Sequence, residues 1–150
     1  MTTIEMVKVY IAQLCTQIGT TPEAVYSQEF NSWNFSKGDI NIEVFFTSYE
    51  TSQKTIRTFM RCFAVVYPMP VEAQKQLDLY RVTMECNSNY MGVKIGVING
   101  KPFIYAIAER DIDGMDYTEF STLIFDHAYW AERLSNELKT KLGAPQTNLN

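Results

Sequence analysis

The segment from about residue 55 to residue 67 is apolar on both faces of a strand pattern, and no other feature limits the possible folds so strongly. One face carries Phe59, Phe63, Val65 and Tyr67, and the other carries Met60, Cys62, Ala64 and Val66. A strand of this kind needs cover on both sides, because exposed apolar surface is unfavourable in water. Helices can cover one face, and we expect a different surface to cover the other.

Two shorter strand patterns precede this segment. Trp33 and Phe35 alternate with polar residues, and the following Gly38 marks a tight turn because glycine adopts a positive φ at little cost. One face of the next strand consists of Ile40, Ile42, Val44 and Phe46. A break near residues 50–53 then leads into residues 55–67. Three strands with such short links predict an antiparallel meander.

Apolar residues three and four positions apart predict helices on either side of the meander. The first helix covers residues 3–18, is capped by Thr2 or Thr3, and stops at Gly19. A short turn can follow at residues 21–23. The second helix opens at Pro70 or Val71 and runs to about residue 85, and its apolar stripe consists of Ala73, Leu77, Tyr80 and Met84.

A hairpin and a long helix complete the pattern. Residues 91–98 and 102–109 read as strands joined at Asn99-Gly100, a pair that favours a type I′ turn. The last helix begins after Asp116, with Glu119 completing a capping-box pair. The predicted order is α-β-β-β-α-β-β-α. This is a two-layer α+β fold in which helices pack against an antiparallel sheet of about five strands.

Length and charge narrow the functional classes. A chain of 150 residues suits one core, so we expect a single domain at 1–143 and a polar C-terminal tail at 144–150. The net charge of −4 and the lack of a basic run argue against nucleic-acid binding. The longest apolar stretch falls short of the ~20 residues of a membrane span, and the N-terminus lacks a signal-peptide layout. We therefore expect a cytoplasmic protein.

Histidines and cysteines, which commonly serve as catalytic residues or metal ligands, are few in this sequence. His127 is the only histidine, which excludes mechanisms with two imidazoles, and its place on an apolar helical stripe predicts a packed, hydrogen-bonded side chain. Cys15, Cys62 and Cys86 are far apart and lie in apolar patterns, so we expect reduced, buried thiols. These observations predict a protein without enzymatic activity, cofactor or metal.

An acidic loop leaves one alternative open. Its carboxylates belong to Glu109, Asp111, Asp113 and Asp116. Oxygen ligands of this kind suit Ca²⁺ or Mg²⁺, so the loop could serve a metal-binding or small-molecule-binding domain. Counted from Asp111, however, the EF-hand spacing fails, because Met115 and Thr122 stand where acidic ligands are required. A solvated turn followed by a helix cap is the simpler interpretation.

The order of elements resembles the type III secretion chaperone-like fold, and within it the YbjN-type family of bacterial sensory transduction regulators. The likeness is most specific in the second half of the chain, at Leu79-Tyr80 to Asn87, Asn99-Gly100, Asp113-Gly114-Met115 and Thr118-Glu119. The resemblance implies a homodimer-forming binding module without catalytic residues. Secretion chaperones wrap an extended effector segment around such a dimer.

The surplus of apolar side chains predicts where a partner binds. If helices cover one sheet face, the other presents a patch on the order of several hundred Å², a size that marks interaction surfaces. The candidate partner-binding residues are Phe45, Tyr49, Phe59, Phe63 and Tyr67. We therefore expect a homodimer that recognises an unknown protein or peptide through these aromatics or through a free strand edge.

Overall fold

The computed structural model describes residues 1–145. Its elements are α1 (Ile4–Ile18), α2 (Pro22–Val25), β1 (Tyr26–Ser27), β2 (Ser32–Lys37), β3 (Ile40–Glu50), β4 (Ile56–Pro68), α3 (Ala73–Asn89), β5 (Lys94–Val97), β6 (Phe103–Asp111) and α4 (Tyr117–Leu142). The predicted order is confirmed, with α2 and β1 added between the first helix and the meander. Of the polar tail expected at 144–150, residues 146–150 lie outside the described residues.

The strands form one antiparallel sheet in the order β1-β2-β3-β4-β6-β5. The sheet has six strands rather than the expected five, because the short β1 pairs with β2 and places Tyr26 opposite Trp33. Two residues are too few to show an alternating pattern, so the sequence gives no signal for this strand. The meander of β2, β3 and β4 is confirmed.

The two hairpin turns that the sequence predicts have different outcomes. Gly38 has φ 57°, so the tight turn between β2 and β3 is confirmed. At Asn99-Gly100 the type I′ prediction is wrong, because Gly100 has a positive φ and Asn99 does not. A mirror-image turn is needed only where two residues join the strands directly. Here β5 ends at Val97 and β6 starts at Phe103, which leaves a longer link.

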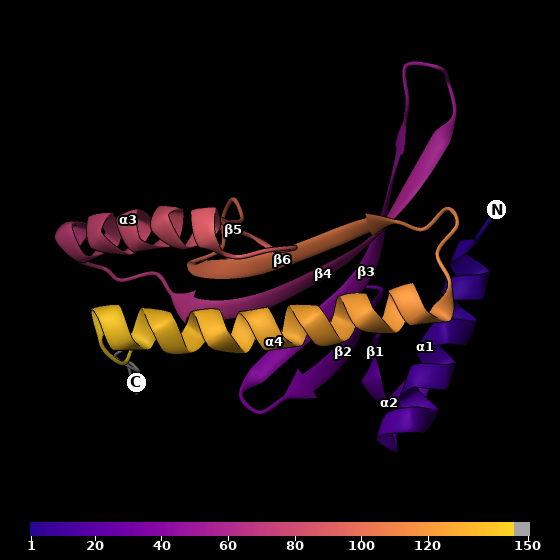
Figure 1. Ribbon diagram of the computed structural model, residues 1–150, viewed down its shortest axis with the longest axis horizontal. Coiled ribbons are helices and arrows are strands. Elements are labelled where there is room, and N and C mark those ends of the chain that lie inside the picture. Colours follow the sequence, from indigo (N-terminus) through magenta and orange to yellow (C-terminus); the bar gives the residue numbers. More distant parts are fainter. Residues whose placement is uncertain (146–150) are drawn as a thin grey trace.

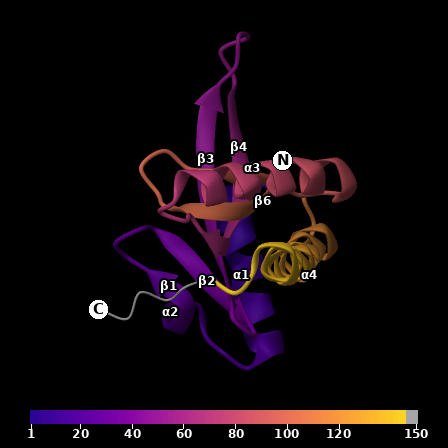
Figure 2. The ribbon, with the colours of Figure 1, turned by 90° about the vertical axis from the view of Figure 1, so that its left-hand side faces the viewer.

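Helix α4 lies along one face of the sheet, which we call the inner face. Helix α1 lies near the first turns of α4, and α3 lies near its last turns (Figure 1). Figure 2 shows α4 nearly end-on, with α3 crossing at an angle to it. The residues of α4 that are buried at this contact include Phe120, Ile124, Ala128, Ala131, Leu134 and Leu138. None of the helices in residues 1–145 combines the length and apolarity needed to cross a bilayer.

The ends of β3 and β4 project beyond the other strands as an arm (Figure 1). Its tip is a polar turn in which the amide of Thr51 donates to the carbonyl of Thr55 at 2.8 Å, and Lys54 adopts φ 58°. At the base of the arm, β6 pairs with β4 as far as Asp111. The arm therefore extends an otherwise compact sheet with a two-stranded ribbon.

Candidate binding surface

Successive side chains of the central strands point to opposite sides, so the sheet has two distinct faces. In β4, Met60, Cys62 and Ala64 are buried on the inner face, beneath α4. Their neighbours Phe59 and Phe63 point the other way and are only partly buried. We call this second side the outer face. Helix α4, which makes the main helical contacts with β3, β4 and β6, lies on the opposite side.

The outer face carries a group of four contacting aromatic rings and a further stacked pair, which together we call the outer aromatic cluster. It consists of Phe45, Tyr49, Phe59, Phe63, Phe103 and Tyr105. The rings of Phe45 and Phe63 meet edge to face with centroids 5.0 Å apart, and Phe63 lies 6.1 Å from Tyr105. Edge-to-face packing suits the ring quadrupoles. The cluster therefore forms an aromatic surface that runs across β3, β4 and β6.

Two arginines lie over these rings. The guanidinium carbon of Arg61 is 4.7 Å from the centroid of Phe63, and that of Arg57 is 5.7 Å from the centroid of Phe59. Cations over ring faces are attracted by the quadrupole. Arginine and aromatic residues are also the types enriched at the centres of protein interfaces.

Carboxylates from β6 hold these cations in place. Glu109 accepts from Arg61 at 2.9 Å and from Lys94, and these hydrogen bonds, with that from Lys94 the stronger influence, lower the pKa of Glu109. Asp111 pairs with Arg57, and its pKa is lowered chiefly by the hydrogen bond from the amide of Asp113. Each of these charges has a partner, and because Glu109 pairs with both Arg61 and Lys94, the five groups together leave a single positive charge beside the aromatic rings.

The structure brings together four of the five residues predicted to bind a partner. Phe45, Tyr49, Phe59 and Phe63 all belong to the outer aromatic cluster. Tyr67 does not, because a β-bulge between Val65 and Tyr67 shifts the register of β4. Tyr67 is consequently buried on the other side, where its hydroxyl donates to the carbonyl of Gly143 at 2.9 Å. The expectation that Tyr67 shares the face of Phe59 and Phe63 is wrong.

Sequence reasoning missed the contribution of β6 to this surface. Phe103 and Tyr105 alternate with the buried Ile104 and Ala106, so period 2 alone would have placed them together. What the sequence could not provide was the strand order. Because β6 pairs with β4 rather than lying at an edge, its aromatic side chains continue the row of rings that starts on β3.

Helix α3 presents a second apolar surface. Its stripe of Ala73, Leu77, Tyr80 and Met84 is exposed, with Leu77 at 60% and Met84 at 73% of the maximum. The contact with α4 is made by a different stripe that includes Leu79 and Cys86. The helix is therefore apolar on two sides, and only one side is covered by residues 1–145. We call the exposed set the α3 stripe.

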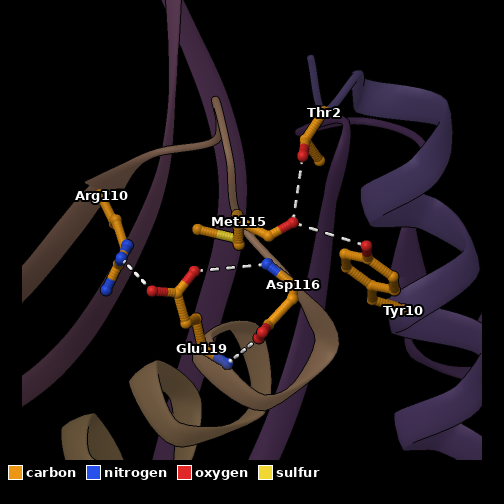
Figure 3. Close-up of polar contacts among 6 residues, drawn as sticks. All are labelled: Thr2, Tyr10, Arg110, Met115, Asp116 and Glu119. Carbon is orange, nitrogen blue, oxygen red and sulfur yellow. Dashed lines mark hydrogen bonds and ion pairs between the residues drawn. The ribbon is translucent and has the colours of Figure 1, made fainter.

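Three of the four carboxylates of the acidic loop make structural contacts. Glu109 and Asp111 form ion pairs with the two arginines of the outer face. Asp116 caps α4 by accepting from the amide of Glu119 at 2.8 Å, while Glu119 accepts from the amide of Asp116 and pairs with Arg110 (Figure 3). Within residues 1–145, no three His, Cys, Asp or Glu side chains form a group that could hold a metal ion.

The same region anchors α1. The carbonyl of Met115 accepts from the hydroxyls of Thr2 and Tyr10, at 3.1 and 3.4 Å (Figure 3). The capping box that the sequence predicts at Asp116 is confirmed. The loop therefore serves as a junction between β6, α4 and the N-terminus, which is a structural role.

The remaining reactive side chains are internal. His127 is 1% exposed, and its Nε2 lies 2.9 Å from the carbonyl oxygen of Ala106, so the predicted packed and hydrogen-bonded histidine is confirmed. Cys15, Cys62 and Cys86 are free and buried, as expected. Burial raises the pKa of the Cys62 thiol to about 12, which keeps it protonated and unreactive at neutral pH.

Comparison with known proteins gives a fold likeness and no sequence family. No family model matches the chain. No curated protein matches it either. Among solved structures, a chain of the ExsC–ExsE complex matches with TM-score 0.63 and 10% identity, covering 91% of this chain and 96% of that one. The Yersinia pestis type III secretion chaperone SycH, crystallised with a stable fragment of YscM2, matches with TM-score 0.50 and 12% identity, over 84% of this chain and 97% of its own. The fold is therefore that of the secretion chaperones, as the sequence predicts.

Proposed function

We propose that this protein is a non-enzymatic, chaperone-like binding module that acts as a homodimer and holds a polypeptide partner on its outer face. In this proposal the outer aromatic cluster, without Tyr67, is the partner-binding surface. The α3 stripe receives the second copy. The protein is further proposed to be a cytoplasmic relative of the YbjN-type family, with its single domain at residues 1–143.

The outer aromatic cluster is the observation that carries this function. Six aromatic residues on three adjacent strands lie on the face opposite α4, and Tyr49 remains 49% exposed. Keeping such a surface in water is unfavourable unless a partner covers it. Aromatic rings supply large contact areas at low cost in conformational entropy, which suits them to bind varied apolar segments.

The fold neighbours support a polypeptide as the partner. Both of the solved structures described above are complexes with a second protein or protein fragment, ExsE in one and YscM2 in the other. A free strand edge, the alternative recognition mode, is less accessible at the ends of the sheet. The edge strand β1 has two residues, and the edge strand β5 is partly closed by Asn87, whose side chain bonds the backbone of Ile95.

The α3 stripe supports self-association as a separate event. Leu77, Tyr80 and Met84 lie three and four positions apart, so they form one continuous strip along the helix. In a symmetric dimer the same strip on each copy would pack against the other. Because this strip lies on α3 rather than on the outer face, a dimer formed through it leaves the outer aromatic cluster free.

Partner capture with matched variants tests the function. The double variant Phe59→Ser/Phe63→Ser removes the centre of the outer aromatic cluster, and Phe30→Ser removes a more exposed phenylalanine that lies outside the cluster. Cross-linking in native cytoplasm followed by mass spectrometry should identify polypeptides that the wild type and Phe30→Ser retain and that the folded double variant loses. Identical sets of captured proteins for all three chains would overturn the proposal.

Self-association has its own test. Light scattering should give the mass of a dimer for the wild type and of a folded monomer for Leu77→Glu/Met84→Glu, because two buried charges would be placed at the contact. Gln74→Glu, which adds a charge at an exposed position of the same helix outside the α3 stripe, is the control. A wild type that stays monomeric at high concentration would refute the dimer.

A further inference from the structure

A stretch of strand edge remains open on the arm, away from the two ends of the sheet. It belongs to β3, whose pairing with β2 stops where Val44 lies opposite Trp33. Asn31 has φ 50°, so the chain before β2 turns away and does not continue alongside Phe46. Residues 46–50, which we call the β3 edge, therefore have β4 on one side and no strand of the described chain on the other (Figure 1).

The register of the arm gives the direction of the backbone groups along this edge. The amide of Thr51 donates to the carbonyl of Thr55 across the hairpin at 2.8 Å. Hydrogen-bonded and non-hydrogen-bonded pairs alternate along antiparallel strands, so Tyr49 also bonds to β4. Ser48 and Glu50 therefore turn their N–H and C=O groups away from β4. No turn, loop or side chain within residues 1–145 bonds to these groups.

The β3 edge lacks the features that usually prevent edge strands from pairing. Such features are a very short strand, a lysine or proline on the edge, a bulge, or cover by another element. Residues 46–50 contain neither lysine nor proline, and their register with β4 is regular. By contrast, β1 has two residues, and β5 is bonded by the side chain of Asn87. The β3 edge is therefore free to accept a further strand.

A strand added at this edge would lie beside the outer aromatic cluster. Phe45 and Tyr49 of β3 belong to the cluster, and Thr47 lies between them on the same face of the strand. Side chains directly opposite each other on neighbouring strands have Cβ atoms about 4.5–5.5 Å apart. Apolar side chains at every second position of the added strand would therefore pack against these rings.

The charge of β3 indicates which kind of strand fits. β3 contains Glu43 and Glu50 and no basic residue, and neither carboxylate makes an ion pair within the described residues. A second copy that paired through this edge would add two more carboxylates without a counter-charge. A segment with a lysine or arginine beside Glu50 would supply that counter-charge. The charge thus favours a basic segment of another protein over a second copy.

We propose that the β3 edge binds an extended segment of the polypeptide partner as an added strand. Backbone hydrogen bonds to Phe46, Ser48 and Glu50 hold the segment, and its alternating side chains give specificity. Apolar side chains lie on the outer aromatic cluster, and a basic side chain lies beside Glu50. The inference rests on the proposed function, since the segment belongs to the partner that the outer face holds.

Three synthetic peptides of equal length test the edge on the whole chain. The first alternates valine with lysine, and the second alternates valine with glutamate. The third is the valine–lysine peptide with the backbone nitrogen of every lysine methylated, which removes the amide hydrogens that would face the edge. We expect the first peptide to bind saturably, the second to bind about fivefold more weakly, and the third not to bind. Equal binding of the first and third peptides would overturn the proposal.

Amide hydrogen exchange locates the bound peptide. In the free protein the amides of Ser48 and Glu50 should exchange faster than those of Thr47 and Tyr49, which face β4. Binding of the valine–lysine peptide should slow the exchange of Ser48 and Glu50. Binding without this protection would show that the peptide lies elsewhere and would refute the assignment. So would the absence of binding up to the solubility limit of the peptide.

Substitutions on the edge provide matched controls. Ser48→Pro removes an amide that faces away from β4, whereas Ser48→Ala removes only the hydroxyl that contacts Thr58. The folded Ser48→Pro chain should lose peptide binding, and Ser48→Ala should keep it. Glu50→Lys, which leaves the backbone unchanged, should reverse the preference between the valine–lysine and valine–glutamate peptides. An unchanged preference in Glu50→Lys would contradict the proposed basic partner.

Light scattering and partner capture separate this inference from the proposed function. A lower mass for Ser48→Pro than for the wild type would mean that the edge holds a second copy, which overturns the inference. Capture of partners should weaken in Ser48→Pro. If Ser48→Pro retains every partner that Phe59→Ser/Phe63→Ser loses, the added strand is wrong while the proposed function stands. If that double variant loses nothing, the proposed function fails whatever the peptides do.

Discussion

Asn87, in the last turn of α3, makes two hydrogen bonds with the backbone of Ile95 in the edge strand β5. Its Nδ2 donates to the carbonyl of Ile95 at 2.9 Å, and its Oδ1 accepts from the amide of Ile95 at 2.7 Å. A side-chain amide thereby imitates the neighbouring strand that β5 lacks. The pair fixes the position of α3 relative to the sheet and covers part of an exposed edge.

Asn87→Ala should lower the free energy of unfolding by about 1–2 kcal/mol, because two hydrogen bonds of ordinary strength are lost. Urea unfolding measures the change. Asn89→Ala is the control, since Asn89 makes one long hydrogen bond to the carbonyl of Glu85 and should change stability little. An Asn87→Ala chain as stable as the control would show that the edge contact contributes nothing.

Phe63→Ala and Phe120→Ala should differ in cost because they remove the same side chain from two environments. Phe120, on the buried side of α4, is fully buried, and its truncation should cost about 3–5 kcal/mol through lost burial and a residual cavity. Phe63 is only partly buried on the outer face, so its truncation should cost about 1–2 kcal/mol. Equal losses in urea unfolding would mean that the outer face is part of the core.

The buried His127 should make stability depend on pH near neutrality. Burial lowers its pKa below the ordinary 6.5, so the unfolded chain binds a proton that the folded chain refuses. The free energy of unfolding is therefore highest above pH 6.5 and falls as the pH is lowered from 6.5 towards the folded-state pKa. Urea midpoints between about pH 7.5 and 5.5 should show this slope.

His127→Gln serves as the control for that slope. It keeps a hydrogen-bond donor but cannot titrate, so its urea midpoint should change little over the same pH range. The carboxylates of Glu109 and Asp111, whose pKa values are also lowered, lose their contributions at more acidic pH and so do not obscure the effect. A wild type with the same flat profile as His127→Gln would contradict the prediction.

Asp116→Ala should destabilise the protein by about 1 kcal/mol, because it removes the side-chain cap of α4. Asp113→Ala is a matched control from the same loop, for although both changes remove one negative charge, only Asp116 accepts from a helix amide. Thermal unfolding of the two variants separates capping from charge. Equal shifts would indicate that the loop acts through its charge alone.

Local periodicity was sufficient for most of the fold. The capping box at Asp116, the stop at Gly19 and the turn at Gly38 follow from residue types whose backbone preferences act over a few positions. The meander and the long helices follow from the change between a period of 2 and a period near 3.6. These features need no knowledge of which elements meet.

The wrong predictions concern residues whose burial depends on segments far away in the sequence. The bulge that turns Tyr67 inward interrupts period 2, and the pairing partner Ile104 that reveals the shift lies far along the chain. The α3 stripe reads like a core-facing surface, yet the helix packs through Leu79 and Cys86. An apolar stripe shows that a surface needs a partner, but the sequence does not show whether that partner is the same molecule.

The arrangement of α4 has a consequence for how the chain is made. This helix comes last in the described sequence, yet it covers the inner sides of β3, β4 and β6 and contacts both α1 and α3. During synthesis, which proceeds from the N-terminus at about 5–20 residues per second, the meander emerges well before α4, the helix that covers it. Until the final helix leaves the ribosome, the nascent strands expose two apolar faces rather than one. They must avoid aggregation during this interval.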